Sequence, residues 1–205
     1  MSKVKLMSAV SALLLSATTP SAFAQVASND PSSVKVGTYK VEPYHTEVEF
    51  SISHFGFSNF LGFFTGASGT LTLDPEKIAA TKLDVTIPVS SVDTTVPVLN
   101  EKLKGDQWFD SAKFANATFT STKVTATGKT TALITGDFTL HGVTKPVTLK
   151  ARLVGSGINP LNKVFTVGFD ATGEIKRSDF GIKTYLPMVG DQVTLRIVGN
   201  FELAQ

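Results

Sequence analysis

The chain of 205 residues contains no cysteine, only one tryptophan and only three histidines. Without cysteine it forms no disulfide and has no thiolate chemistry, and three histidines alone make neither a convincing zinc set nor a catalytic triad. The sequence also lacks a Gly-x-Ser-x-Gly elbow, a P-loop and a dinucleotide-binding fingerprint. We therefore expect a protein with no catalytic residues, no bound metal and no cofactor.

Charge is sparse as well, since charged residues make up 18% of the chain and the formal net charge is +2. The longest apolar run, residues 6–17, follows two lysines and precedes a small-x-small site at residues 22–24. This pattern predicts a secretory signal peptide over residues 1–24 and a periplasmic location, because the run is too short to span a membrane. Its removal would take both lysines and leave a net charge of zero, which argues against a nucleic-acid partner.

Most of the remaining chain consists of short runs in which apolar and polar residues alternate, the pattern of strands with one apolar face. Such runs lie at residues 47–54, 63–73, 83–89, 117–124, 132–140, 147–153, 165–171 and 193–201. Only Pro97 to Asp110 looks helical, with Gly105 as a plausible stop. About eight strands of this kind and one short helix predict an all-β, antiparallel barrel in a single domain over residues 37–205. Residues 25–36 are expected to be a flexible leader.

The apolar faces of these strands mix large and small side chains. Phe50, Phe138 and Phe169 share their faces with small residues such as Ala67 and Ala151. An eight-stranded barrel is about wide enough either to fill with side chains or to hold one ligand, and small inward residues favour the second case. Residues 55–64 also carry more phenylalanine than a turn needs, which suggests an apolar, lipid-like ligand.

Five groups of motifs, in order along the chain, resemble the YceI-like family. They are Tyr39-x-Val41 with His45-Thr46, Val48, Phe50, His54, Gly56, Gly62 and Phe64; Ser91-Val92-Asp93-Thr94; Leu103 with Trp108-Phe109-Asp110; Phe119-x-Ser121-Thr122 with residues 136–147; and residues 177–181. The resemblance covers nearly all of the chain after residue 24. It implies a lipocalin-like antiparallel barrel, secreted by a bacterium, that holds a long isoprenoid such as a quinone or a polyprenyl phosphate.

Five polar residues are candidates for contact with the lipid head group: His54, His45, Asp93, Arg177 and Asp179. His54 is in phase with Phe50 and Ile52 and should face inward, where it would either bind a head-group oxygen or be an ordinary core histidine. His45 is at an odd offset from His54, so the two imidazoles should face opposite sides and do not form a metal site. Arg177 would either clamp a phosphate or form an Arg-Asp pair that ties a loop over one end of the barrel.

A larger apolar set is expected to contact the lipid tail or simply to fill the barrel. Its members are Phe50, Ile52, Phe57, Phe60, Phe63, Leu99, Leu103, Trp108, Phe119, Phe138, Phe165 and Phe169. If Phe60 or Phe114 is exposed, a homodimer is plausible.

Three functions are compatible with these residues. The first is a periplasmic carrier that binds an isoprenoid lipid, has no integral membrane span and does no chemistry. The second is an enzyme that acts on a lipid head group with His54 or His45 as general base. The third is a structural protein whose barrel is filled by its own side chains.

Overall fold

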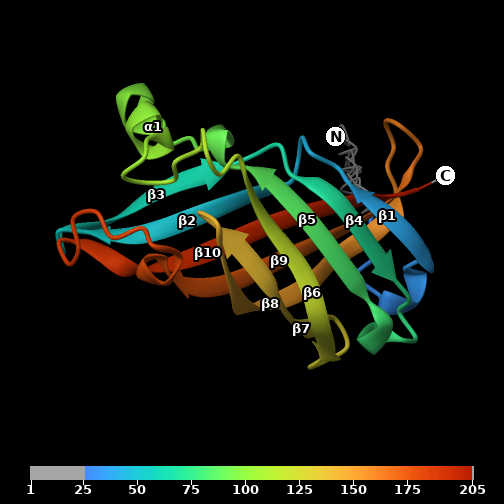
Figure 1. The fold of residues 1–205 in the computed structure, drawn as a ribbon. Coiled ribbons are helices and arrows are strands. Elements are labelled where there is room, and N and C mark those ends of the chain that lie inside the picture. The colour runs from blue at the N-terminus through green and yellow to red at the C-terminus, as the bar shows by residue number, and fades with distance from the viewer. Residues whose placement is uncertain (1–25, 205) are drawn as a thin grey trace, which may run out of the picture.

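The computed structural model describes residues 26–204, which form a strongly curved sheet with one α-helix at one end (Figure 1). The strands are Gly37–Val41 (β1), Glu47–His54 (β2), Ser58–Phe64 (β3), Ser68–Leu73 (β4), Lys82–Pro88 (β5), Asn116–Ala126 (β6), Thr131–Leu140 (β7), Val143–Ile158 (β8), Phe165–Lys176 (β9) and Val189–Leu203 (β10). The helix is Pro97–Lys104 (α1), and short 3₁₀ helices lie at Pro31–Ser33 (η1), Ile78–Ala80 (η2), Val89–Ser91 (η3) and Arg177–Phe180 (η4).

Eight of the strands close into a ring. Their order is β1-β4-β5-β6-β7-β8-β9-β10, and β1 pairs with both β4 and β10, so the ring has no free edge. Neighbouring strands are antiparallel throughout. The strands β2 and β3 form a hairpin that extends the sheet from β10. β2 pairs with residues 189–198 of β10, where Leu195 is opposite Phe50, while β1 pairs with residues 201–203. The predicted antiparallel barrel of about eight strands is confirmed.

Two of the expected elements differ in length from the prediction. The run expected at residues 63–73 is broken into β3 and β4 at Gly66, whose φ is +68°. The helix expected to reach Asp110 ends at Lys104, because Gly105 has extended dihedral angles (φ −71°, ψ 171°) and the chain continues in turns. Pro97 does begin the helix, as expected for a residue whose missing N–H is not needed in the first turn.

The barrel has two different ends, the helix end and the opposite end. The helix end consists of the β2–β3 turn, residues 89–115 with α1, the β7–β8 turn and residues 177–188. The opposite end consists of residues 26–36, the β4–β5 loop with η2, the β6–β7 turn and the β8–β9 loop (Figure 1).

The segment before β1 contacts the barrel at the opposite end. Ser28 forms a bridge with Ser156, the side chains of Ser33 and Ser156 are hydrogen-bonded at 2.8 Å, and Val34 is buried. Residues 26–36 are the described part of the predicted leader, whose mobility stays a prediction. The predicted signal peptide at residues 1–24 lies outside the described residues.

Two glycines on inward faces serve strand packing and not the cavity. At Gly69 (φ +138°) a Cβ would lie 2.0 Å from the carbonyl oxygen of Asp84, so only glycine allows β4 to approach β5 at this point. At Gly136 the space is taken by the ring of Phe119, whose Cζ would be 2.5 Å from a Cβ. Position 69 therefore needs glycine because the β5 backbone is close, and position 136 needs it because the ring of Phe119 fills the space.

Replacing Gly69 by alanine is expected to destabilise the protein by about 2–4 kcal/mol, because the new methyl group meets backbone and the dihedral angle is unfavourable. Urea unfolding measures the loss. Gly56→Ala is a suitable control, since Gly56 also has a positive φ (+73°) but a Cβ there meets nothing within 4 Å. An equal loss in both variants would show that backbone strain alone, and not the contact with Asp84, requires glycine at position 69.

Candidate ligand-binding cavity

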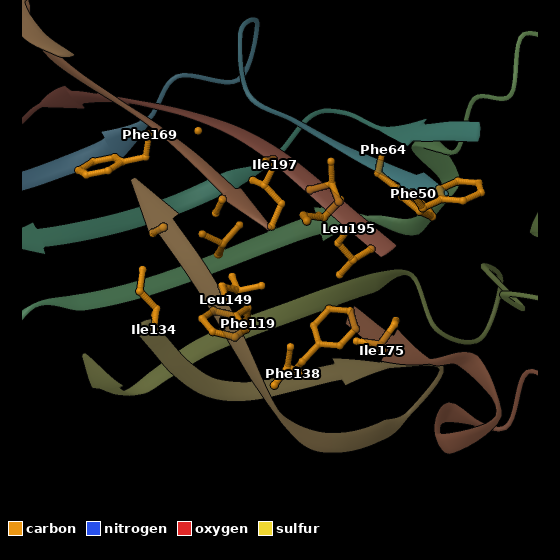
Figure 2. Close-up of a pocket in the computed structure, with 18 of the residues that line it drawn as sticks. Phe50, Phe64, Phe119, Ile134, Phe138, Leu149, Phe169, Ile175, Leu195 and Ile197 are labelled. Carbon is orange, nitrogen blue, oxygen red and sulfur yellow. The ribbon is translucent and has the colours of Figure 1, made fainter. Parts of the chain in front are cut away.

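The ring encloses a cavity of about 740 Å³, within the range of ~300–1,000 Å³ that is typical of small-molecule sites. Its walls come from every strand of the ring, from β2 and β3, and from α1. Figure 2 shows aromatic and aliphatic side chains around this space, among them Phe50, Phe119, Phe138 and Phe169. The barrel is therefore not filled by its own side chains, and the structural alternative that required a solid interior is not supported.

A row of alanines makes much of this room. Ala132 of β7 pairs with Ala151 of β8, which pairs in turn with Ala171 of β9, and all three line the cavity. The next strand in the row contributes Ile197, which pairs with Ala171. Where three neighbouring strands place methyl groups at the same level, the space that larger side chains would fill stays open.

The charged residues on the cavity wall are all basic and lie at its ends. Arg177 and Lys102 line it at the helix end and Lys129 at the opposite end, and no aspartate or glutamate of the described chain is part of the lining. The middle of the barrel is apolar. An apolar tail would contact the middle, and electron-rich or anionic groups are favoured at the ends.

Three segments meet at the helix end and are tied together by hydrogen bonds. The amide of Phe55 in the β2–β3 turn donates to the carbonyl of Met188 at 2.8 Å. The hydroxyl of Thr184 donates to the carbonyl of Gln107 at 2.6 Å. From α1, Lys102 Nζ donates to the hydroxyl of Tyr185 at 3.2 Å and lies over its ring. These ties hold residues 182–190 against both the hairpin and the segment that follows α1.

Arg177 is the buried charge at this end, with 4% of its surface exposed. Its guanidinium donates to three carbonyl oxygens, those of Gly190 (2.7 Å), Val189 (2.8 Å) and Ile182 (3.1 Å). Burial lowers the pKa of Arg177, and the nearby charge of Asp191 opposes that shift. Arg177 is thus tied to residues 182–190 through backbone carbonyls and not through the Arg-Asp pair of the loop-anchoring alternative, and it also lies on the cavity wall.

Asp191 fixes the segment that carries Arg177. Its two carboxylate oxygens accept hydrogen bonds from the amide and the hydroxyl of Ser178, at 2.9 and 2.7 Å. Desolvation raises the pKa of Asp191, but these hydrogen bonds and the charge of Arg177 outweigh it and leave the pKa below its ordinary value. Arg177 thus has a counter-charge nearby without a direct ion pair.

The structure brings two of the five predicted head-group residues to the cavity. His54 lines it at the helix end together with Phe50 and Ile52, as the alternation of β2 predicts, and Arg177 lies on the same end.

His45 is not on the cavity wall. Its side chain is 79% exposed and its Nδ1 lies 2.8 Å from Glu42. Asp93 is not on the cavity wall either. Its carboxylate accepts hydrogen bonds from the side chain of Asn100 and the amide of Thr95, and these hydrogen bonds lower its pKa. Asp179 lies in a shallow outer groove beside Lys176. None of these three residues lines the cavity.

Nine of the twelve predicted tail residues line the cavity: Phe50, Ile52, Phe60, Leu99, Leu103, Trp108, Phe119, Phe138 and Phe169. Phe57 does not, because it is at the tip of the β2–β3 turn and is 90% exposed. Phe63 pairs with Glu49 on the outer face of the hairpin. Phe165 is buried in a cluster with Tyr39 and Val167.

Several lining residues were not among the predicted site residues. The inward face of β10, with Leu195 and Ile197, could have been found from its alternation. Lys102 and Tyr185 also line the cavity. No sequence signal indicates them, because they are 83 positions apart and meet only in the folded chain.

Phe60 and Phe114, on which the predicted homodimer depends, are both half-buried. Phe60 lines the cavity and Phe114 packs against His141, with ring centroids 4.6 Å apart. Dimerisation stays a prediction. Among residues 26–204, no helix has the length and apolar character that crossing a membrane would require, and no three His, Asp or Glu side chains gather in a way that could hold a metal ion.

A closed antiparallel ring of eight strands around an apolar cavity, with cationic groups only at its ends, defines a lipocalin-like barrel. Comparison with known proteins agrees. The model of the YceI-like domain matches residues 39–201, and the chain belongs to this family. Protein YceI of Escherichia coli O157:H7 is 44% identical over 161 residues, which are 78% of this chain and 83% of that protein.

Solved structures show the same fold. The crystal structure of Burkholderia cenocepacia BcnA has a TM-score of 0.70 and 26% identity, with 78% of this chain and 98% of that chain covered. A polyisoprenoid binding domain from Saccharophagus degradans has a TM-score of 0.60 and 18% identity, with 83% and 100% covered. At 18% identity the second likeness shows the fold alone.

Proposed function

We propose that this protein is a periplasmic carrier that holds one long isoprenoid lipid, a quinone or a polyprenyl phosphate, in its barrel without chemistry on it. The observation that carries the proposal is the apolar cavity of about 740 Å³. The neighbour from Saccharophagus degradans is described as a polyisoprenoid binding domain, which supports the same ligand class for this fold.

The tail accounts for most of the expected affinity. Burial of an apolar chain contributes roughly 0.8 kcal/mol per CH₂, so a long prenyl tail gains more from the wall than one or two polar contacts add at the head. The basic residues at the two ends, with no acidic residue on the wall, suit an anionic or electron-rich head group. The predicted signal peptide supports the periplasmic location.

The proposal predicts that the protein purified from its own host carries a stoichiometric lipid. Native mass spectrometry of the mature protein, followed by organic extraction, measures the added mass and identifies the head group. A long-chain isoprenoid at one copy per chain is the expected result. An apo mass, together with no uptake of added ubiquinone or polyprenyl phosphate by the delipidated protein, would exclude the carrier function.

A further inference from the structure

Six of the fourteen large apolar side chains that residues 26–204 expose lie at the helix end. They come from the β2–β3 turn, from the start of α1 and from residues 185–188, and are called the apolar rim here: Phe55, Phe57, Val96, Val98, Tyr185 and Met188. Hydrogen bonds from Phe55 to Met188 and from Lys102 to Tyr185 join the three segments. Exposed apolar residues gathered in this way mark a surface that binds a partner.

The apolar rim surrounds an opening of the cavity. Phe55 and Tyr185 are exposed and also line the cavity, as do His54 and Lys102. No other exposed large apolar side chain of the described chain is part of the lining. At the opposite end, the exposed lining residues are Ala126, Gly128 and Lys129. Exposed apolar surface is therefore continuous with the cavity wall at the helix end only.

The backbone displays these aromatic side chains at a conformational cost. Phe55 and Tyr185 have positive φ values of +53° and +61°, which are unfavourable for aromatic residues and are retained mainly where function requires them. The amide of Phe57 donates to the carbonyl of His54 at 3.0 Å and closes the turn, and Phe57 is left 90% exposed. A ring held in solvent gains nothing from the core, but it would gain from burial against an apolar partner.

The charge around the apolar rim favours an anionic partner. Residues 54–58, 96–104 and 182–188 contain three lysines and one glutamate. The glutamate, Glu101, pairs with Lys104 at 2.8 Å, whereas Lys102 and Lys183 form no ion pair within residues 26–204. The next acids along the chain, Asp106 and Asp110, lie in the turns after α1. Apolar side chains beside unpaired lysines are complementary to the surface of a bilayer that contains anionic lipids.

We propose that the apolar rim docks on the surface of a phospholipid bilayer and that the lipid enters and leaves the cavity there. This inference rests on the proposed carrier function, because an isoprenoid lipid resides in a bilayer and its tail is excluded from water. In the docked state Phe57 and Val98 contact the lipid chains, and Lys102 and Lys183 lie near the phosphates. The opening between Phe55 and Tyr185 then faces the membrane.

Binding to vesicles that contain no isoprenoid tests the docking by itself. Sedimentation of the mature protein is measured with phosphatidylglycerol vesicles and with phosphatidylcholine vesicles. Phe57→Ser is expected to weaken binding to both by at least about fivefold, because the buried area of the ring is lost. Tyr44→Ser is the matched control, since Tyr44 is also 90% exposed but lies in the β1–β2 loop, outside the apolar rim. It should bind like the wild type.

The lysines are tested with the same vesicles. Lys183→Gln is expected to weaken binding to phosphatidylglycerol about threefold to fivefold and to leave binding to phosphatidylcholine nearly unchanged. Lys163→Gln, in the exposed β8–β9 loop at the opposite end, should change neither. Equal losses in Lys183→Gln and Lys163→Gln would mean that the attraction comes from the charge of the whole protein and not from the apolar rim.

Transfer of ubiquinone or polyprenyl phosphate, whichever the protein binds, from loaded protein to vesicles connects docking with the carrier function. Phe57→Ser should transfer the lipid several-fold more slowly and bind it in solution with unchanged affinity, because Phe57 does not line the cavity. Lipid uptake without vesicle binding by the wild type, or equal losses in Phe57→Ser and Tyr44→Ser, would overturn the docking proposal alone. Failure to take up either lipid would instead remove the carrier function on which it rests.

Discussion

Replacing Ala171 by phenylalanine is expected to lower lipid occupancy more than tenfold while the barrel stays folded. Ala171 lies in the alanine row of β7, β8 and β9 and lines the cavity, so a benzyl group there would occupy space that the tail needs. Overpacking of a filled core costs about 1–3 kcal/mol, but here the ring enters a cavity and gains apolar contacts. We expect the melting temperature to change little or to rise. Dye displacement and thermal unfolding measure the two effects.

The matched control is Thr172→Phe, one residue further along the same strand. Thr172 is exposed, and successive side chains of a strand face opposite sides, so this variant adds the same group outside the barrel. It should bind lipid like the wild type. Normal binding in Ala171→Phe would show that the lipid does not use the middle of the cavity.

Replacing Arg177 by methionine is expected to cost about 3–5 kcal/mol of unfolding free energy. Methionine fills much of the same volume but leaves the carbonyls of Ile182, Val189 and Gly190 without their donor. The course of residues 182–190 depends on these hydrogen bonds. Chemical denaturation measures the loss, and hydrogen exchange should show faster opening of these residues than of β9.

Arg152→Met tests whether the loss is specific to a buried arginine. Arg152 pairs with Asp170 on the surface, where both side chains are about half exposed, and exposed ion pairs contribute roughly 0–1 kcal/mol. Its replacement should change stability by less than about 1 kcal/mol. Similar small losses in both variants would mean that water replaces Arg177 at the three carbonyls and that the loop needs no anchor.

The parts of the fold and the site that follow from local alternation could be predicted. In β2, a period of two predicts that Phe50, Ile52 and His54 face inward, and all three line the cavity, with His54 at its exposed end. The rule fails where the chain turns: Phe55 and Gly56 both have positive φ, so the phase is broken before Phe57, which points into solvent. After the turn, pairing with β2 sets the phase again, and Phe60 faces inward opposite Ile52.

Contacts between distant segments could not be predicted from pattern. Arg177 was a candidate, but its partners are the carbonyls of Ile182, before β10, and of Val189 and Gly190, at the start of β10, and only the folded chain brings them to its guanidinium. Phe165 has the same alternation as Phe169, yet it is packed in a cluster with Tyr39 and Val167 while Phe169 reaches the cavity. Alternation tells which side of the sheet a residue faces, and the local depth of packing decides whether space remains beside it.

The pairing of β1 with β10 joins residues near 39–41 to residues 201–203. This contact closes a loop of some 160 residues, and such non-local pairings carry a loop-closure entropy cost that slows folding. Until it forms, β1 and β10 each have an open edge and the apolar interior faces water. The lipid-binding space is therefore a property of the completed chain, and no fragment that ends before β10 would enclose it.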